Sequence, residues 1–139
     1  DTRFGARGQI ALLAYELGPL TPNETSSVTL YWQRMSAESI DTSFRAFIHV
    51  ARDEADQARV GSQDAMPVRD LFPTTCWQQG VVVKDARQVP VAKDAQPGRY
   101  PVFVGLYDPV GGARPPTFAS LPARELHGSI LLPEPAVVR

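Results

Sequence analysis

Short stretches in which apolar and polar residues alternate recur along the chain, and a period of two is typical of β-strands that bury one face. The clearest stretch is SVTLYWQR at 27–34, where Val28, Leu30 and Trp32 share one face. The other stretches predicted to be strands are residues 9–17, 43–52, 59–63, 81–89, 100–107 and 124–132. No stretch favours a helix, so the chain is predicted to be all-β.

Prolines and glycines separate these stretches. The chain has 13 prolines and 10 glycines, and they lie between the apolar segments instead of gathering in one linker. About eight short strands joined by such turns predict two antiparallel sheets packed face to face, as in a jelly-roll or immunoglobulin-like β-sandwich. We expect one domain over residues 1–139, with a core at about 8–132, a long surface loop at 64–80 and an exit or linker at 133–139.

The charge balance excludes several partners. Fourteen basic and fifteen acidic residues give a net charge of −1, so the basic excess of a protein that binds nucleic acid or an anionic membrane is missing. No apolar run approaches the roughly 18 residues that span a bilayer, and the first residues do not form a signal peptide. We therefore expect a soluble segment that neither binds nucleic acid nor inserts into a membrane.

The sequence contains few groups suited to catalysis. Cys76 is the only cysteine, which excludes an internal disulfide, and beside Trp77 it is expected to pack as a small apolar residue. The chain has neither a phosphate-binding glycine loop nor a Gly-x-Ser-x-Gly motif. We expect no catalytic residue and no cofactor. The least favoured alternative is a hydrolase that combines His49 with Asp85 or Cys76.

Acidic residues cluster after the predicted strand at 43–52. Asp53, Glu54 and Asp56 lie in one predicted turn, and Asp64 follows. Oxygen ligands on a loop suit calcium, although the spacing is not that of an EF-hand. Solvated turn residues are the favoured interpretation, and a calcium site at Asp53, Asp56 and Asp64 is the weaker alternative.

Two other polar residues are expected inside the fold. Asp85 follows three valines within a predicted strand, where an ionised group needs partners. We expect a structural, hydrogen-bonded carboxylate, with Arg114 or His49 as its partner. His49 lies on the same strand face as Phe47 and is expected to be a structural histidine with satisfied hydrogen bonds.

Aromatic residues are the candidates for ligand binding, because a planar apolar ring beside polar groups suits a sugar. Trp77 and Phe118 lie in predicted loops, and Tyr107 ends a predicted strand. Together with Arg114, these three residues form the candidate ligand site. For Trp77 the alternative is that its ring closes one end of the core.

Seven segments occur in an order that characterises a known domain. They are Gly8–Tyr15, Val28–Gln33, Phe47–Val50, Phe72–Gly80, Val83 with Asp85, Pro97–Tyr100, and Val104–Pro109 followed by Gly112 and Arg114. In these segments the chain resembles the C-terminal β-sandwich domain of bacterial polytopic membrane glycosyltransferases related to dolichyl-phosphate-mannose protein mannosyltransferases.

This resemblance implies an extracytoplasmic accessory domain, tethered to the membrane through the membrane portion of its parent protein. The parent's catalytic acids would lie in that portion, so the resemblance assigns no catalytic residue here. It places His49, Trp77, Asp85, Tyr107 and Arg114 in the recurring pattern of the domain. A glycan or a lipid-linked sugar is the implied ligand, and a purely structural or protein-interaction module is the alternative.

Overall fold

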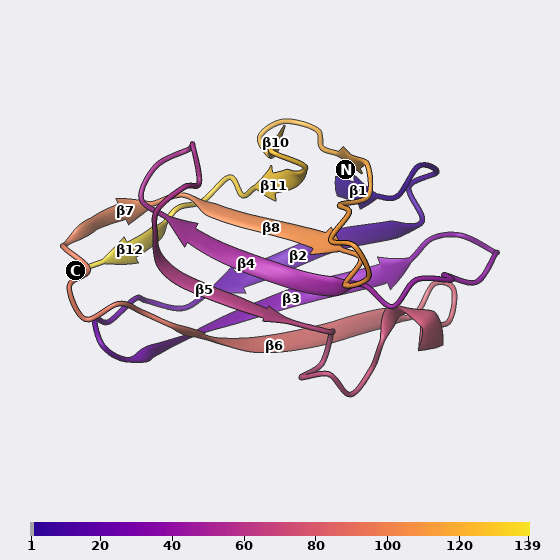
Figure 1. Cartoon of the computed structure of the whole chain (residues 1–139), viewed down its shortest axis with the longest axis horizontal. Helices are drawn as coiled ribbons and strands as arrows, with labels where there is room; N and C mark the ends of the chain where they lie inside the picture. Colours follow the sequence, from indigo (N-terminus) through magenta and orange to yellow (C-terminus); the bar gives the residue numbers. More distant parts are fainter. Residues whose placement is uncertain (1) are drawn as a thin grey trace.

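Two antiparallel sheets of five strands each lie face to face in the computed structural model, which describes residues 2–139 (Figure 1). The all-β sandwich predicted from the alternation is therefore confirmed, with twelve strands instead of about eight. A two-stranded ribbon, β12-β7, extends from one end of the sandwich.

The first sheet has the strand order β6-β3-β2-β1-β9. Its strands are β1 (Thr2–Phe4), β2 (Ile10–Leu17), β3 (Thr25–Arg34), β6 (Val82–Pro90) and β9 (Thr117–Phe118). The second sheet has the order β10-β11-β8-β4-β5. Its strands are β4 (Arg45–Ala51), β5 (Arg59–Ala65), β8 (Val102–Tyr107), β10 (Arg124–Leu126) and β11 (Ser129–Leu131). The ribbon pairs β7 (Gly98–Tyr100) with β12 (Ala136–Val138).

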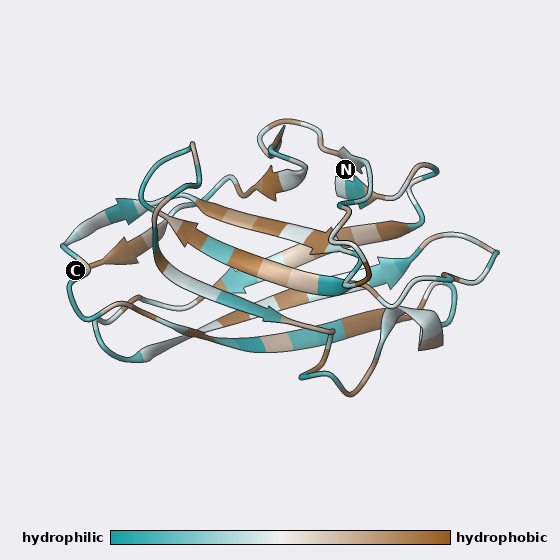
Figure 2. Ribbon diagram, in the orientation of Figure 1, coloured by the Kyte–Doolittle hydropathy of each residue, from teal (hydrophilic) through white to brown (hydrophobic). Residues whose placement is uncertain are grey.

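The core lies between the two sheets, because alternate residues of each strand point inward. Val28, Leu30 and Trp32 of β3 are buried, as their shared face predicts. Strand β8 is apolar along most of its length (Figure 2). Both of its faces are buried, since its inward residues face the core and loops and side chains cover its outward residues. The middle of β6 is hydrophilic, although alternate residues of this strand are buried. Two charged side chains therefore enter the core from β6.

Two predicted strands are each divided into two. The stretch at 100–107 is interrupted at Pro101, which has no N–H group to donate to a sheet. The stretch at 124–132 is a hairpin of β10 and β11, which turns at His127 and Gly128, both with positive φ. Such a tight turn favours glycine at its second position.

The boundaries of the core differ from the expectation. Residues 136–138, expected in an exit segment, form β12 and pair with β7. At the other end, Phe4 of β1 is buried in the core. Both segments are too short to show alternation, so only their pairing partners determine that they become strands.

The long loop predicted at 64–80 lies between β5 and β6, over residues 66–81. It contains one turn of 3-10 helix, η1 (Thr74–Cys76). Trp77 follows this turn and is 2% exposed, with its ring 6.3 Å from that of Trp32. Cys76 is exposed instead of packed, because the turn directs its neighbour Trp77 into the core. No helix in residues 2–139 has the length and apolar character needed to cross a membrane.

Candidate functional site

The outward side of the β10-β11-β8-β4-β5 sheet, hereafter the outer face, carries an unusual row of aromatic side chains. Phe47 of β4 lies opposite Gly105 of β8, and His49 lies opposite Phe103. The rings of Phe47 and His49 stack with their centroids 4.3 Å apart. A Cβ atom on Gly105 would lie 2.2 Å from Cζ of Phe47. The Phe47 ring therefore lies directly over the glycine, which leaves room for it.

One end of the outer face carries a polar triad of Arg45, Asp64 and Tyr107, contributed by strands β4, β5 and β8. The Tyr107 hydroxyl donates to Asp64 Oδ2 at 2.5 Å, and Arg45 Nε donates to Asp64 Oδ1 at 2.8 Å. The hydrogen bond to the Asp64 carboxylate raises the pKa of Tyr107. These bonds hold a partly exposed aromatic ring beside one carboxylate and one guanidinium.

Arg114 covers the middle of the outer face. Its guanidinium lies 4.5 Å from the centre of the Phe47 ring, within the range of a cation–π contact. Its Nη1 atom donates to the His127 carbonyl at 2.6 Å. The ring centroids of Phe47 and Tyr107 are 6.4 Å apart. Phe47 therefore links two residues that the sequence proposed as ligand contacts, Tyr107 and Arg114.

A histidine–carboxylate pair lies next to this row. His49 Nδ1 is 2.8 Å from Asp56 Oδ2, and Arg59 Nε donates to Asp56 Oδ1 at 2.9 Å. Burial lowers the pKa of His49 and outweighs its hydrogen bond to Asp56. Burial alone would raise the pKa of Asp56, but the hydrogen bonds from Arg59 and His49 lower it overall. At neutral pH the pair is therefore a neutral imidazole, with its proton on Nδ1, beside a carboxylate.

We expect this pair to make stability depend on pH. Because the pKa of His49 is lower in the folded chain, the unfolded chain binds the proton more readily. Stability should therefore decline as pH falls below about 6.5, the unfolded value, and level off below the folded pKa. Urea unfolding at about pH 7.5 and about pH 5.5 measures the decline. In His49→Gln the decline should be clearly smaller, and an unchanged decline would contradict this assignment.

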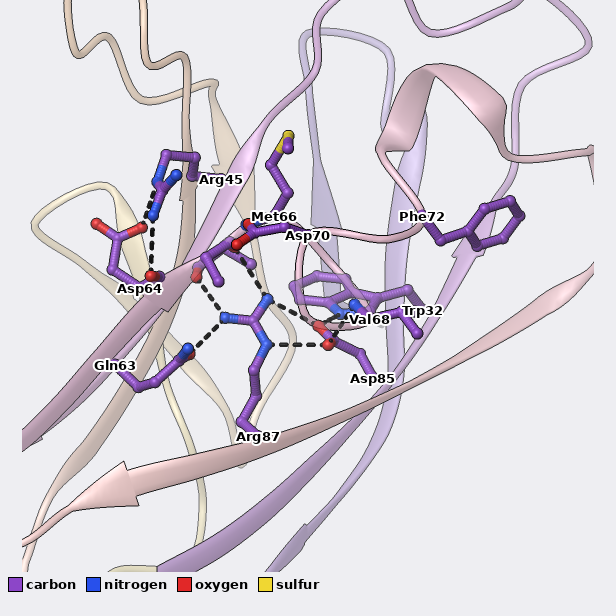
Figure 3. Close-up of polar contacts among 12 residues, drawn as sticks. Trp32, Arg45, Gln63, Asp64, Met66, Val68, Asp70, Phe72, Asp85 and Arg87 are labelled. Atoms are coloured by element: carbon purple, nitrogen blue, oxygen red, sulfur yellow. Dashed lines mark hydrogen bonds and ion pairs between the residues drawn. The ribbon is translucent and has the colours of Figure 1, made fainter. Parts of the chain in front are cut away.

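A second polar cluster lies inside the sandwich (Figure 3). Asp85 and Arg87 are 0% and 2% exposed, and both point inward from β6. Arg87 Nε and Nη2 donate to the two carboxylate oxygens of Asp85 at 2.9 and 2.8 Å. Asp85 also accepts from Trp32 Nε1 at 3.1 Å and from the Val68 amide at 2.8 Å.

The remaining Arg87 donors bind the opposite sheet. They reach the carbonyls of Ala46 and Ala65 and the side chain of Gln63 at 2.8, 3.1 and 2.6 Å. All five guanidinium donors therefore have acceptors. The buried partner of Asp85 is Arg87, not Arg114 or His49 as the sequence suggested. The sequence does contain a signal for this pair. Asp85 and Arg87 are two residues apart on one strand, so their side chains lie on the same face of the sheet.

The amide that binds Asp85 belongs to a strained turn. Val68, Arg69 and Asp70 all have positive φ, between 53° and 64°, which is a rare conformation for a β-branched residue. The Asp70 side chain accepts a hydrogen bond from the Met66 amide at 2.8 Å. The buried carboxylate therefore anchors the start of the loop that carries Trp77.

The structure separates the four proposed ligand residues. Tyr107 and Arg114 meet on the outer face through Phe47. Trp77 is buried against Trp32 and closes the core, so it offers no surface for a ligand. Phe118 is half exposed, but it lies on β9 at the edge of the other sheet, opposite Arg3. Their positions in predicted loops do not reveal that Trp77 packs into the core and that Phe118 joins the edge of the other sheet.

The calcium alternative has no support. Asp56 binds His49 and Arg59, Asp64 belongs to the polar triad, and Asp53 accepts from the Ala55 amide at 2.9 Å. No three His, Cys, Asp or Glu side chains within residues 2–139 form a group that could hold a metal ion. The carboxylates that are close in sequence point to different partners.

The proposed hydrolase pairs are also not formed. His49 binds Asp56 on the outer face, whereas Asp85 lies between the sheets and binds Arg87. Cys76 lies in the loop between β5 and β6. The sequence pattern did not identify Arg45, Arg59 or Gln63 as polar partners. Cross-strand register brings Arg45 opposite Tyr107, and Arg59 follows its partner Asp56 by only three residues. Gln63 meets Arg87 across the two sheets, a contact that no sequence spacing indicates.

Comparison with protein-family models and with curated proteins found no match for this chain.

Proposed function

We propose that this chain is a non-catalytic accessory module that binds carbohydrate through the outer face. The observation that carries the proposal is the polar triad, in which Tyr107 is partly exposed and held against Asp64 and Arg45. A sugar ring has an apolar face that stacks on an aromatic ring, and hydroxyl groups that bind carboxylates and guanidinium groups. The triad presents both kinds of group in fixed positions.

The resemblance described above supports the wider context of this proposal. On that basis the module is extracytoplasmic and belongs to a membrane glycosyltransferase, whose membrane portion would carry the catalysis. The ligand is then a glycan or a lipid-linked sugar that the parent enzyme handles. Membrane spans encoded upstream of Asp1 in the gene would support this parentage, and a gene with none would contradict it.

One observation favours a second candidate function, a protein-interaction module. Phe118 and Leu121 are 50% and 82% exposed, and they lie within four residues of each other. Exposed apolar side chains on one segment are typical of contact sites between proteins. For this candidate, Leu121→Ser should abolish binding of a partner domain without changing any binding of sugars.

We expect Tyr107→Ala to weaken sugar binding about tenfold, which corresponds to a loss of about 1.4 kcal/mol. The variant loses the stacking surface and leaves Asp64 without the hydroxyl. Isothermal titration with sugars selected on a glycan array measures the affinity.

Tyr31→Ala is the matched control for this experiment. Tyr31 lies on the outward side of the other sheet, and its hydroxyl also donates to a carboxylate, that of Glu16. Removing it should leave the affinity unchanged. Equal losses in both variants, or no sugar bound by the wild type at millimolar concentrations, would rule out the proposed site.

A further inference from the structure

A groove of about 440 Å³ lies between β7, the β10-β11 hairpin and the β4–β5 hairpin. This volume falls within the usual range of small-ligand sites, roughly 300–1,000 Å³. Prolines and leucines, among them Pro101, Leu131 and Pro133, form one part of the wall. Arg99 and Arg124 line the groove as well, together with Asp53 and Glu54. The groove therefore combines a non-polar wall with charged groups, as amphipathic ligands require.

The charges in this groove are not all compensated within the protein. Arg124 Nη2 donates to Glu54 Oε2 at 2.7 Å, so these two residues neutralise each other. Asp53 has no cationic partner among residues 2–139, and its carboxylate accepts a hydrogen bond from the Ala55 amide. Arg99 differs, because its guanidinium has no ion-pair or hydrogen-bond partner among residues 2–139. It offers five donors in a planar fork, which suits a carboxylate or phosphate group.

The groove and the polar triad lie at opposite ends of the outer face. Leu131 in the groove pairs with Phe103, whereas Tyr107 ends the same strand, β8. Five residue steps separate Val102 from Tyr107, or about 17 Å at about 3.4 Å per residue. Arg114 lies between the two ends, over Phe47, and it too has no carboxylate partner among the described residues. Arginines without a carboxylate partner therefore occur both in the groove and on the path towards Tyr107.

We propose that the groove binds the anionic unit, a uronate or a phosphate-substituted sugar, of a glycan that extends along the outer face to Tyr107. Arg99 pairs with the anionic group, and the proline and leucine wall contacts the non-polar side of the sugar. This inference rests on the proposed function and specifies its ligand class. A single sugar ring cannot reach both ends, so the ligand is an oligosaccharide.

Titration with matched oligosaccharides tests the inference. The probes are oligogalacturonates, the same oligomers with every carboxylate methyl-esterified, and glycerol-phosphate oligomers carrying sugar substituents. The first two share the same sugar chain and differ in the charge and the ester methyl group of each carboxylate, and the third distinguishes phosphate from carboxylate. The variant is Arg99→Gln, and its control is Lys93→Gln, which removes the same charge from an exposed position outside the groove.

We expect Arg99→Gln to weaken binding of at least one acidic probe roughly tenfold or more, as for a lost charge-assisted hydrogen bond. Binding of the esterified probe should not change in Arg99→Gln, and Lys93→Gln should behave as the wild type. Tyr107→Ala should weaken binding of both the acidic and the esterified oligomers.

Each alternative result has a definite meaning. If acidic and esterified probes bind equally well, or if Arg99→Gln has no effect on acidic probes, the inference is wrong. The proposed function would survive that result if Tyr107→Ala still weakened binding. If acidic probes depend on Arg99 but not on Tyr107, the groove is supported and the triad is rejected as a sugar site. Absence of binding for all three probes overturns the inference.

Discussion

Replacing Arg87 by methionine is expected to lower the free energy of unfolding by about 3–5 kcal/mol, because it leaves the Asp85 carboxylate buried without its charge partner. The change also removes the donors that bind the Ala46 and Ala65 carbonyls. A domain of this size has a total stability of about 5–15 kcal/mol, so the loss is a large fraction of the total. Urea unfolding followed by tryptophan fluorescence measures it, since Trp32 donates to Asp85.

Three further variants separate the ion pair from general effects of substitution. Lys84→Met changes an exposed residue of the same strand and should alter stability by less than about 0.5 kcal/mol. Arg87→Lys keeps the charge but has three donors instead of five, so we expect an intermediate loss. Asp85→Asn combined with Arg87→Met should be more stable than Arg87→Met alone, because no unpaired charge remains buried. A double variant that is less stable than Arg87→Met would contradict this explanation.

Gly105→Ala is expected to lower the free energy of unfolding by about 1–3 kcal/mol, the usual cost of overpacking a filled site. The added Cβ would lie 2.2 Å from Cζ of Phe47 and within 3 Å of two other ring atoms. The ring must move, and both His49 and Arg114 rest against it. Chemical denaturation gives the loss, and the ring-current shifts of His49 in NMR spectra report the displacement.

A double-mutant cycle with Phe47→Ala tests this cause. Without the ring, the added methyl group has room, so Gly105→Ala should have little effect on stability in the Phe47→Ala background. If the glycine substitution destabilises both backgrounds equally, the loss arises from the strand backbone and not from the ring. The same cycle, measured on sugar affinity, shows whether the support of Arg114 by Phe47 matters for binding.

The strands with clear alternation could be predicted because burial of one sheet face requires that pattern. Residues 27–34 and 81–89 lie within β3 and β6 or overlap them almost completely. The short strands β1, β9 and β12 could not be predicted, since two or three residues do not define a period. Their formation depends on backbone pairing with distant segments, as when Val138 pairs with Gly98.

The candidate site was predictable only in part. Tyr107 and Arg114 are recognisable as an aromatic and a cationic residue suited to a ligand, but nothing in their spacing shows that Phe47 joins them. The sequence places Asp64 near Asp53 and Asp56 and so suggests an acidic cluster, because proximity along the chain is the only relation it shows. The register of β4 with β5 and β8 instead brings Asp64 to Arg45 and Tyr107.

The sequence by itself determined the all-β class, the two-sheet arrangement and the burial of the main strand faces, because these follow from local period and turn residues. Only the tertiary structure decided that Asp85 and Arg87 lie between the sheets, that His49 meets Asp56 on the outer face, and that Arg99 has no partner among residues 2–139. The physical reason is that electrostatic and hydrogen-bond partners act over a few ångströms in space. Strand register, which depends on the whole sheet, sets those distances.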